Sequence, residues 1–152
     1  MSLPSPPSLL TPGRLLILLG NLAYSLGAFA ADYNTTHVYN PRWPPHAKFH
    51  NGQTMSLGVL LCLTSLTFLW KSTTTTNPGA KDREKQREDL WWAAVVGSLY
   101  CLAGLSAIWY PGTAWTDPEF VLDEGQMTQM PIFAAVVVGM WLGYGVEVWR
   151  MG

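Results

Sequence analysis

Four apolar stretches, each close to the length of a membrane-crossing helix, alternate with polar segments along the chain. The hydrocarbon core of a bilayer is about 30 Å thick, and a helix needs about 20 residues to cross it. The four stretches are residues 12–31, 46–70, 91–109 and 131–149. Each is apolar on all sides, whereas a surface helix is apolar along one stripe. The pattern predicts an all-α fold, with residues 1–152 forming a single domain, an integral membrane four-helix bundle.

The second stretch predicts a helix that begins before its apolar residues do. Its apolar part starts only at Met55, but the Pro44–Pro45 pair before it suits the first turn of a helix, where the missing N–H of proline breaks no hydrogen bond. A helix beginning there has His46, His50 and Gln53 at positions i, i+4 and i+7. We therefore expect these three side chains on one face of the helix, just outside the lipid.

The polar segments alternate in charge. Of the nine Lys and Arg residues, seven lie in segment 1–14, in segment 71–89 or at the C-terminal end, and the other two are Arg42 and Lys48. Positively charged loops stay on the cytoplasmic side of a membrane. We therefore expect both termini to be cytoplasmic and the loops 32–53 and 110–130 to share the opposite face. In a eukaryotic cell the expected location is the endoplasmic reticulum, with these loops in the lumen.

The composition agrees with a membrane protein and excludes some partners. Only 12% of the residues are charged and 49% are hydrophobic, whereas a soluble domain has about 25% charged residues. The net charge of −1 offers no basic surface, so we expect no nucleic acid partner. Cys62 and Cys101 lie inside apolar stretches and lack the spacing of a zinc or thiol redox motif. We expect no cofactor and no bound metal.

All three histidines lie in the loop between the first and second apolar stretches or just after it. The run from Asp32 to Gln53 reads DYNTTHVYNPRWPPHAKFHNGQ. Its three prolines restrict the backbone and stiffen the crossing. A rigid crossing that holds imidazoles near a carboxylate is typical of a preorganised acid–base site. The candidate catalytic residues of this run are Asp32, His37, His46 and His50.

The loop 110–130 is expected on the same membrane face and adds acidic groups. Asp117 and Glu119 are its candidate catalytic residues. Carboxylates at an apolar boundary have raised pKa values and histidines lowered ones, which favours proton transfer near neutral pH. The candidate substrate-binding residues of the two loops are Asn34, Arg42, Trp43, Asn51, Gln53 and Gln126.

Several of these residues have structural alternatives. Asp32 could cap its loop by bonding to the backbone of residue 34 or 35. His46 and His50 could chelate a metal, since histidines at i and i+4 do so readily, or could be hydrogen-bonded residues at the membrane interface. Arg42 could simply stack on Trp43.

The fourth stretch has two features that predict packing. Gly139 and Gly143 form a small-xxx-small face that permits close contact between helices. This face could pack inside the bundle or support a homo-oligomer. Glu147 precedes Arg150 by three residues, and we expect the two to pair at the cytoplasmic interface.

The run from Ala31 to His50, ADYNTTHVYNPRWPPHAKFH, resembles a block found in a family of small four-helix membrane proteins of bacteria and fungi. The block combines an Asp, three His and Trp-Pro-Pro at set spacing. The chain is also similar to the small membrane hydrolases of fungal polyketide pathways of the aurovertin and citreoviridin kind. In those pathways an epoxide formed by a flavin monooxygenase is opened by water or an internal hydroxyl. The resemblance implies that Asp32 and the histidines form the acid–base set.

The predicted function is a membrane-embedded acid–base enzyme for a lipophilic secondary metabolite, most specifically an epoxide hydrolase or cyclase acting on a polyketide epoxide. Its expected partners are the lipophilic substrate and the lipid bilayer. One alternative is an isomerase or terpene cyclase of the small membrane-bundle type. Another is a non-catalytic lipid-binding or scaffolding subunit that recruits cytosolic enzymes through segment 71–89.

Overall fold

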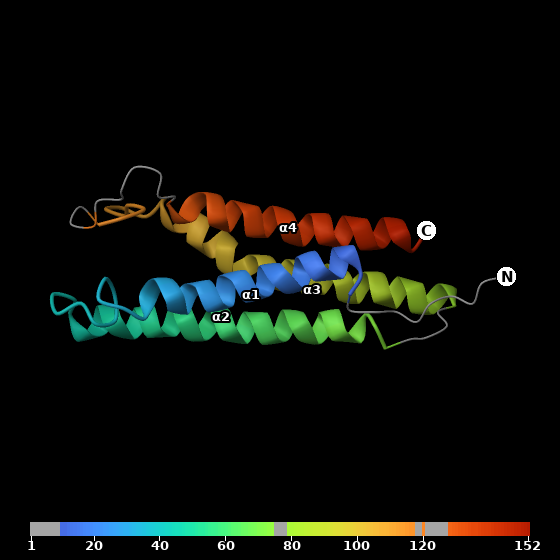
Figure 1. The fold of residues 1–152 in the computed structure, drawn as a ribbon, viewed down its shortest axis with the longest axis horizontal. Helices are drawn as coiled ribbons and strands as arrows, with labels where there is room; N and C mark the ends of the chain where they lie inside the picture. The colour runs from blue at the N-terminus through green and yellow to red at the C-terminus, as the bar shows by residue number, and fades with distance from the viewer. Residues whose placement is uncertain (1–9, 75–78, 118–119, 121–127) are drawn as a thin grey trace.

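The chain folds as a bundle of four long helices. The computed structural model describes residues 10–74, 79–117, 120 and 128–152. The helices are α1 (Pro12–Asp32), α2 (Pro45–Lys71), α3 (Ala80–Ala107) and α4 (Gln129–Arg150). They run alternately in opposite directions, each packs on the next, and α4 packs back on α1 (Figure 1). The described residues contain no strand, which confirms the predicted all-α class.

Two helix starts follow from local sequence. The second helix begins at Pro45, as predicted. The third begins at Ala80, before the apolar stretch that starts at residue 91, because the mixed-charge run 81–89 favours a helix and forms its first turns. The Asp82 carboxylate accepts a hydrogen bond from the Gly79 N–H (3.0 Å) and so satisfies a donor at this helix start.

All four helices are long and apolar enough to cross a membrane. Their outward faces are covered with large apolar side chains that water would solvate poorly, among them Leu19, Leu26, Leu60, Leu63, Val138 and Leu142. A soluble bundle would place polar groups there. The structure therefore has the length and the apolar outer surface of an integral membrane protein.

A buried polar network crosses the middle of the bundle. The Asn21 amide of α1 donates to the Ser65 Oγ of α2 (2.9 Å) and to the Ile17 carbonyl (2.9 Å). Ser65 in turn donates to the Ala93 carbonyl of α3 (2.7 Å), and the Tyr24 hydroxyl donates to Asn21 Oδ1 (3.0 Å). Polar groups in hydrocarbon are stable only when they find such partners. The network therefore fixes α1, α2 and α3 relative to one another.

The small-residue face of α4 is used inside the bundle at one of its two glycines. A Cβ added to Gly143 would lie 2.6 Å from the Gly13 carbonyl oxygen of α1, so only glycine permits this approach. A Cβ added to Gly139 would meet nothing within 4 Å. Packing within the bundle thus occupies Gly143, and a homo-oligomer formed through this face stays a prediction.

An ion cluster closes the bundle at the end where α1 begins and α4 finishes. The predicted Glu147–Arg150 pair is confirmed, with Arg150 Nη1 3.2 Å from Glu147 Oε1. Arg14 also contacts Glu147, with its Nη1 3.5 Å from Oε2, and both side chains are almost fully buried. Arg14 further donates to the Ser72 Oγ (3.3 Å) and carbonyl (3.1 Å) at the end of α2. The cluster therefore joins α1, α2 and α4.

Candidate active site

A cavity of about 840 Å³ lies between the helices at the end of the bundle opposite the ion cluster. It is bounded by the last turns of α1 and α3, the first part of α4, and the stretch of α2 from Thr54 to Leu61. Its walls are mostly alanine, glycine, leucine, isoleucine and phenylalanine residues. Its volume falls within the range of small-molecule sites, which is about 300–1,000 Å³. The cavity can therefore hold an apolar molecule of moderate size.

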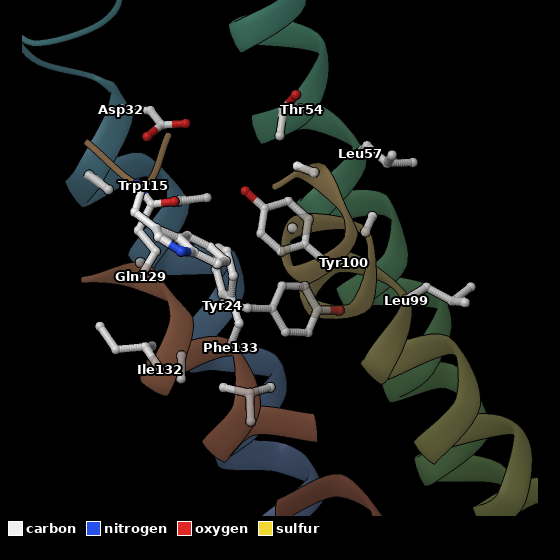
Figure 2. A pocket seen from close by; sticks show the side chains of 18 of the residues that line it. Tyr24, Asp32, Thr54, Leu57, Leu99, Tyr100, Trp115, Gln129, Ile132 and Phe133 are labelled. Atoms are coloured by element: carbon white, nitrogen blue, oxygen red, sulfur yellow. The ribbon is translucent and has the colours of Figure 1, made fainter. Parts of the chain in front are cut away.

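A small set of polar groups reaches this apolar cavity. Figure 2 shows Asp32 and Thr54 at one end, with the rings of Tyr24, Tyr100 and Phe133 deeper in the bundle. The remaining polar or amphipathic groups in the lining are His37, Thr113, Trp115 and Gln129. Few and convergent polar groups in an apolar pocket are characteristic of a site that orients one substrate.

Asp32 lies at one end of the cavity and is contacted by two neighbouring side chains. It is the last residue of α1, and its side chain is 15% exposed. The Asn51 amide of α2 donates to its Oδ2 at 2.8 Å, and His37 Nε2 lies 3.9 Å from its Oδ1. The contacts of this carboxylate run to Asn51 and His37, not to the backbone of residues 34 and 35. The capping alternative is therefore not the arrangement that the structure adopts.

The neighbours of His37 determine which of its ring nitrogens carries the hydrogen. The Thr36 hydroxyl lies 2.6 Å from Asn34 Oδ1, an atom that can only accept, so the hydroxyl donates to it. His37 Nδ1, 2.7 Å from the same hydroxyl oxygen, must then be the donor to Thr36. This leaves His37 Nε2 as the ring nitrogen on the Asp32 side, 3.9 Å from the carboxylate.

Asn34 builds the loop. Its amide donates to the Ala31 carbonyl (2.7 Å) at the end of α1, while its Oδ1 also accepts from the Thr36 N–H (2.7 Å). Trp43 packs its ring edge-on against His37, with centroids 4.9 Å apart. These two predicted substrate-binding residues therefore hold Thr36 and His37 in place, and neither lines the cavity.

His46 and His50 share a face, as the spacing predicted, but neither of them lines the cavity. Their Nε2 atoms are 3.0 Å apart, and His50 Nδ1 lies 3.2 Å from Gln53 Oε1. All three side chains are exposed and absent from the cavity lining. They therefore take no part in the cavity that Asp32 and His37 line.

The remaining candidates lie away from the cavity or outside the described part of the chain. Arg42 and Asp117 are exposed and do not line the cavity. Glu119 and Gln126 fall outside the described residues.

Tyr39 lies at the loop surface, where a hydrogen bond with Tyr33 raises the pKa of Tyr39. Its hydroxyl therefore cannot act as a base near neutral pH.

Sequence reasoning missed the two tyrosines of the cavity. Tyr24 lies about two turns before Asp32 on α1, a spacing that could have placed it on the same side. Tyr100 belongs to α3, and no sequence signal connects it with the loop. Its ring stacks on Tyr24 at 5.3 Å and packs over Gly58 of α2. The Tyr100 hydroxyl points into the cavity toward the end that holds Asp32 (Figure 2).

Comparison with known proteins identifies the family. The chain belongs to a protein family of unknown function, DUF6640, whose profile matches residues 16–152. The match covers nearly all of the bundle, including the loop with Asp32 and His37. No curated protein and no solved structure matches the chain. Because the family description names no activity, the likeness to epoxide-opening enzymes remains a proposal.

Proposed function

We propose that this DUF6640 protein is a membrane-embedded acid–base enzyme for a lipophilic small molecule, most specifically one that opens an epoxide with water or an internal hydroxyl. The observation that carries the proposal is the position of Asp32 and His37, whose side chains line one end of a large apolar cavity. A carboxylate oriented by Asn51 and placed near an imidazole is suited to proton transfer.

The walls of the cavity support a lipophilic substrate that arrives from the bilayer. A second groove of about 490 Å³ lies between α1 and α4 and shares Ala23, Ile132 and Val136 with the cavity. Its other residues include Leu16 and Leu19, which face outward from the bundle. A polyene or terpenoid could therefore pass between α1 and α4 and leave its polar end beside Asp32.

Asp32 would act as the base that activates the nucleophile. The Asn51 amide holds the Asp32 carboxylate at the end of the cavity. A water molecule in the cavity could donate one hydrogen to this carboxylate, and its oxygen would then face the substrate.

Tyr100 would supply the proton to the epoxide oxygen from the other side of the substrate. As the water oxygen forms its bond to carbon, the carbon–oxygen bond of the epoxide breaks and the leaving oxygen takes the phenolic proton. Asp32 takes the proton of the water, and exchange with solvent restores both groups. The product is a diol, or a cyclic ether where an internal hydroxyl replaces the water. No covalent enzyme intermediate is required.

The proposed orientation places this chemistry on the non-cytoplasmic face, in the lumen of the endoplasmic reticulum. The ends of α1 and α4 that carry Arg14 and Arg150 lie at the end of the bundle opposite the cavity. If the positively charged end is cytoplasmic, both termini are cytoplasmic and the cavity opens toward the lumen.

A metabolite comparison in isotopically labelled water tests the proposal. Source cells that lack the protein should accumulate a lipophilic epoxide, which membranes from complemented cells should convert in H₂¹⁸O. One ¹⁸O atom per product molecule indicates hydrolysis, and an isomeric, unlabelled cyclic ether indicates opening by an internal hydroxyl. If the cells instead accumulated an alkene that the membranes only isomerise or cyclise, the result would contradict epoxide opening and favour the isomerase or terpene cyclase alternative. No accumulated precursor would contradict an enzymatic role.

Filling the cavity should block turnover without unfolding the protein. Gly27 lines the cavity, and a Cβ added there meets nothing within 4 Å. We expect Gly27→Leu to lower conversion of the accumulated precursor by about tenfold or more, since smaller changes in pocket shape already cost that much. Gly145→Leu is the matched control, because Gly145 is equally open but lies outside the cavity. Equal loss in both variants would argue against the cavity as the substrate site.

A further inference from the structure

We propose that His46 and His50 form a separate binding site for a divalent transition-metal ion that prefers right-angled ligands, namely Cu(II) or Ni(II). The two imidazoles stand on the first turns of α2, exposed and outside the cavity. The acid–base mechanism proposed for the cavity uses neither of them. The site is therefore independent of that mechanism and can be tested without knowledge of the substrate.

The distance between the two nitrogens suits one kind of ion. His46 Nε2 and His50 Nε2 are 3.0 Å apart. With metal–nitrogen bonds of about 2.0–2.1 Å, this separation corresponds to a nitrogen–metal–nitrogen angle of about 91–97°. Neighbouring ligands of a square-planar or tetragonal ion subtend about this angle, and Cu(II) and Ni(II) adopt that geometry. Tetrahedral zinc, with an angle of about 109°, would need the nitrogens about 3.3–3.4 Å apart.

Gln53 orients one of the two ligands. Its Oε1 lies 3.2 Å from His50 Nδ1 and can only accept, so Nδ1 carries the hydrogen and Nε2 presents its lone pair. This is the arrangement that supporting residues provide around metal-bound histidines. Without a metal, His46 Nε2–H donates to His50 Nε2. When a metal binds, it takes the place of this hydrogen bond, and the neutral His46 ring carries its hydrogen on Nδ1 instead.

The described residues supply two ligands of the coordination sphere, His46 and His50. No group of three or more His, Cys, Asp or Glu side chains in the described part of the chain is arranged to hold a metal. Water would therefore fill the other positions, which suits a tetragonal ion with two fixed equatorial nitrogens. The Phe49 ring lies parallel to the His46 ring, with centroids 6.0 Å apart, and supports it from the same helical turn.

Copper titration of purified protein carrying no affinity histidines tests this site. We expect one Cu(II) per chain, with an electron paramagnetic resonance spectrum showing tetragonal symmetry and coupling to two nitrogens. His50→Ala should remove that signal, and Gln53→Ala should weaken binding by about 10–100-fold, as loss of a supporting residue typically does. His37→Ala should leave the spectrum unchanged, because His37 lies at the cavity and not at this pair.

Three results would overturn the proposal. A spectrum without coupling to two nitrogens would show that the pair does not chelate. Copper binding that survives in His50→Ala, or that is lost in His37→Ala, would place the ion elsewhere. Tighter retention of Zn(II) than of Ni(II) would contradict the right-angled geometry. Circular dichroism of each variant would establish that the helices remain folded.

Discussion

Replacement of Asp32 by asparagine is expected to lower the conversion of the accumulated precursor by about 10²–10⁴-fold, the usual contribution of a general acid or base. The change is nearly isosteric. The new side-chain carbonyl can still accept the hydrogen bond that the Asn51 amide donates to Asp32 Oδ2 at 2.8 Å. What is lost is the negative charge beside His37 and the ability to take a proton from water. The fold should therefore survive while the chemistry fails.

The measurement compares initial rates in membranes that contain equal amounts of the two proteins. Glu84→Gln is the control, because it removes one exposed carboxylate from α3, at the end of the bundle away from the cavity. A rate for Asp32→Asn equal to that of the intact protein would contradict acid–base catalysis at this site. If replacement of the exposed Lys81, Arg83 and Lys85 by glutamine abolished metabolite output at the same time, the scaffolding alternative would be the better account.

The helices were predictable because a bilayer imposes strict requirements on length and apolarity. The start of α2 at Pro45 followed from proline chemistry. The early start of α3 at Ala80 did not follow from hydropathy, because the charged residues before the apolar part do not need lipid to be helical. Here Gln86 and Asp89 turn inward and are buried, so packing within the bundle extends the helix beyond the apolar stretch.

The composition of the site was only partly predictable, and α2 shows why. Helical spacing fixed which residues share a face with His50, but not which face meets the other helices. The inward row of α2 is Met55, Gly58, Cys62, Ser65 and Leu69. Extension of this row by one turn toward the N-terminus reaches Asn51, the partner of Asp32, rather than His50. This row can be recognised in the sequence from its helical spacing, whereas the approach of Tyr100 from α3 depends on tertiary packing alone.

Replacement of Glu147 by alanine is expected to cause the largest loss of stability, about 3–5 kcal/mol, the typical cost of removing one partner of a buried ion pair. Arg14 and Glu147 have side chains that are only 5% and 3% exposed. Without the carboxylate, the buried Arg14 charge would keep its hydrogen bonds to Ser72 but would lose the negative charge that faces it inside the bundle. Thermal unfolding in detergent, followed by circular dichroism, measures the loss. Arg150→Met is the control and should change stability by about 0–1 kcal/mol, because the Arg150 side chain is 42% exposed.

A double replacement separates the loss of the pair from the loss of packing. When both charges of a buried pair are replaced by apolar residues of similar size, stability is often regained, because no charge is left without a partner. We therefore expect the double variant Arg14→Met/Glu147→Met to be more stable than Glu147→Ala. Its loss of stability should also be smaller than the sum of the losses caused by the two single replacements. Additive losses would mean that the two side chains do not depend on each other. The Gly13 N–H, which donates to Glu147 Oε1 at 3.2 Å, would then explain the burial of the carboxylate better than Arg14 does. The cluster lies at the end of the bundle opposite Asp32, so below the unfolding temperature the double variant should still convert the precursor, and stability and activity can be measured separately.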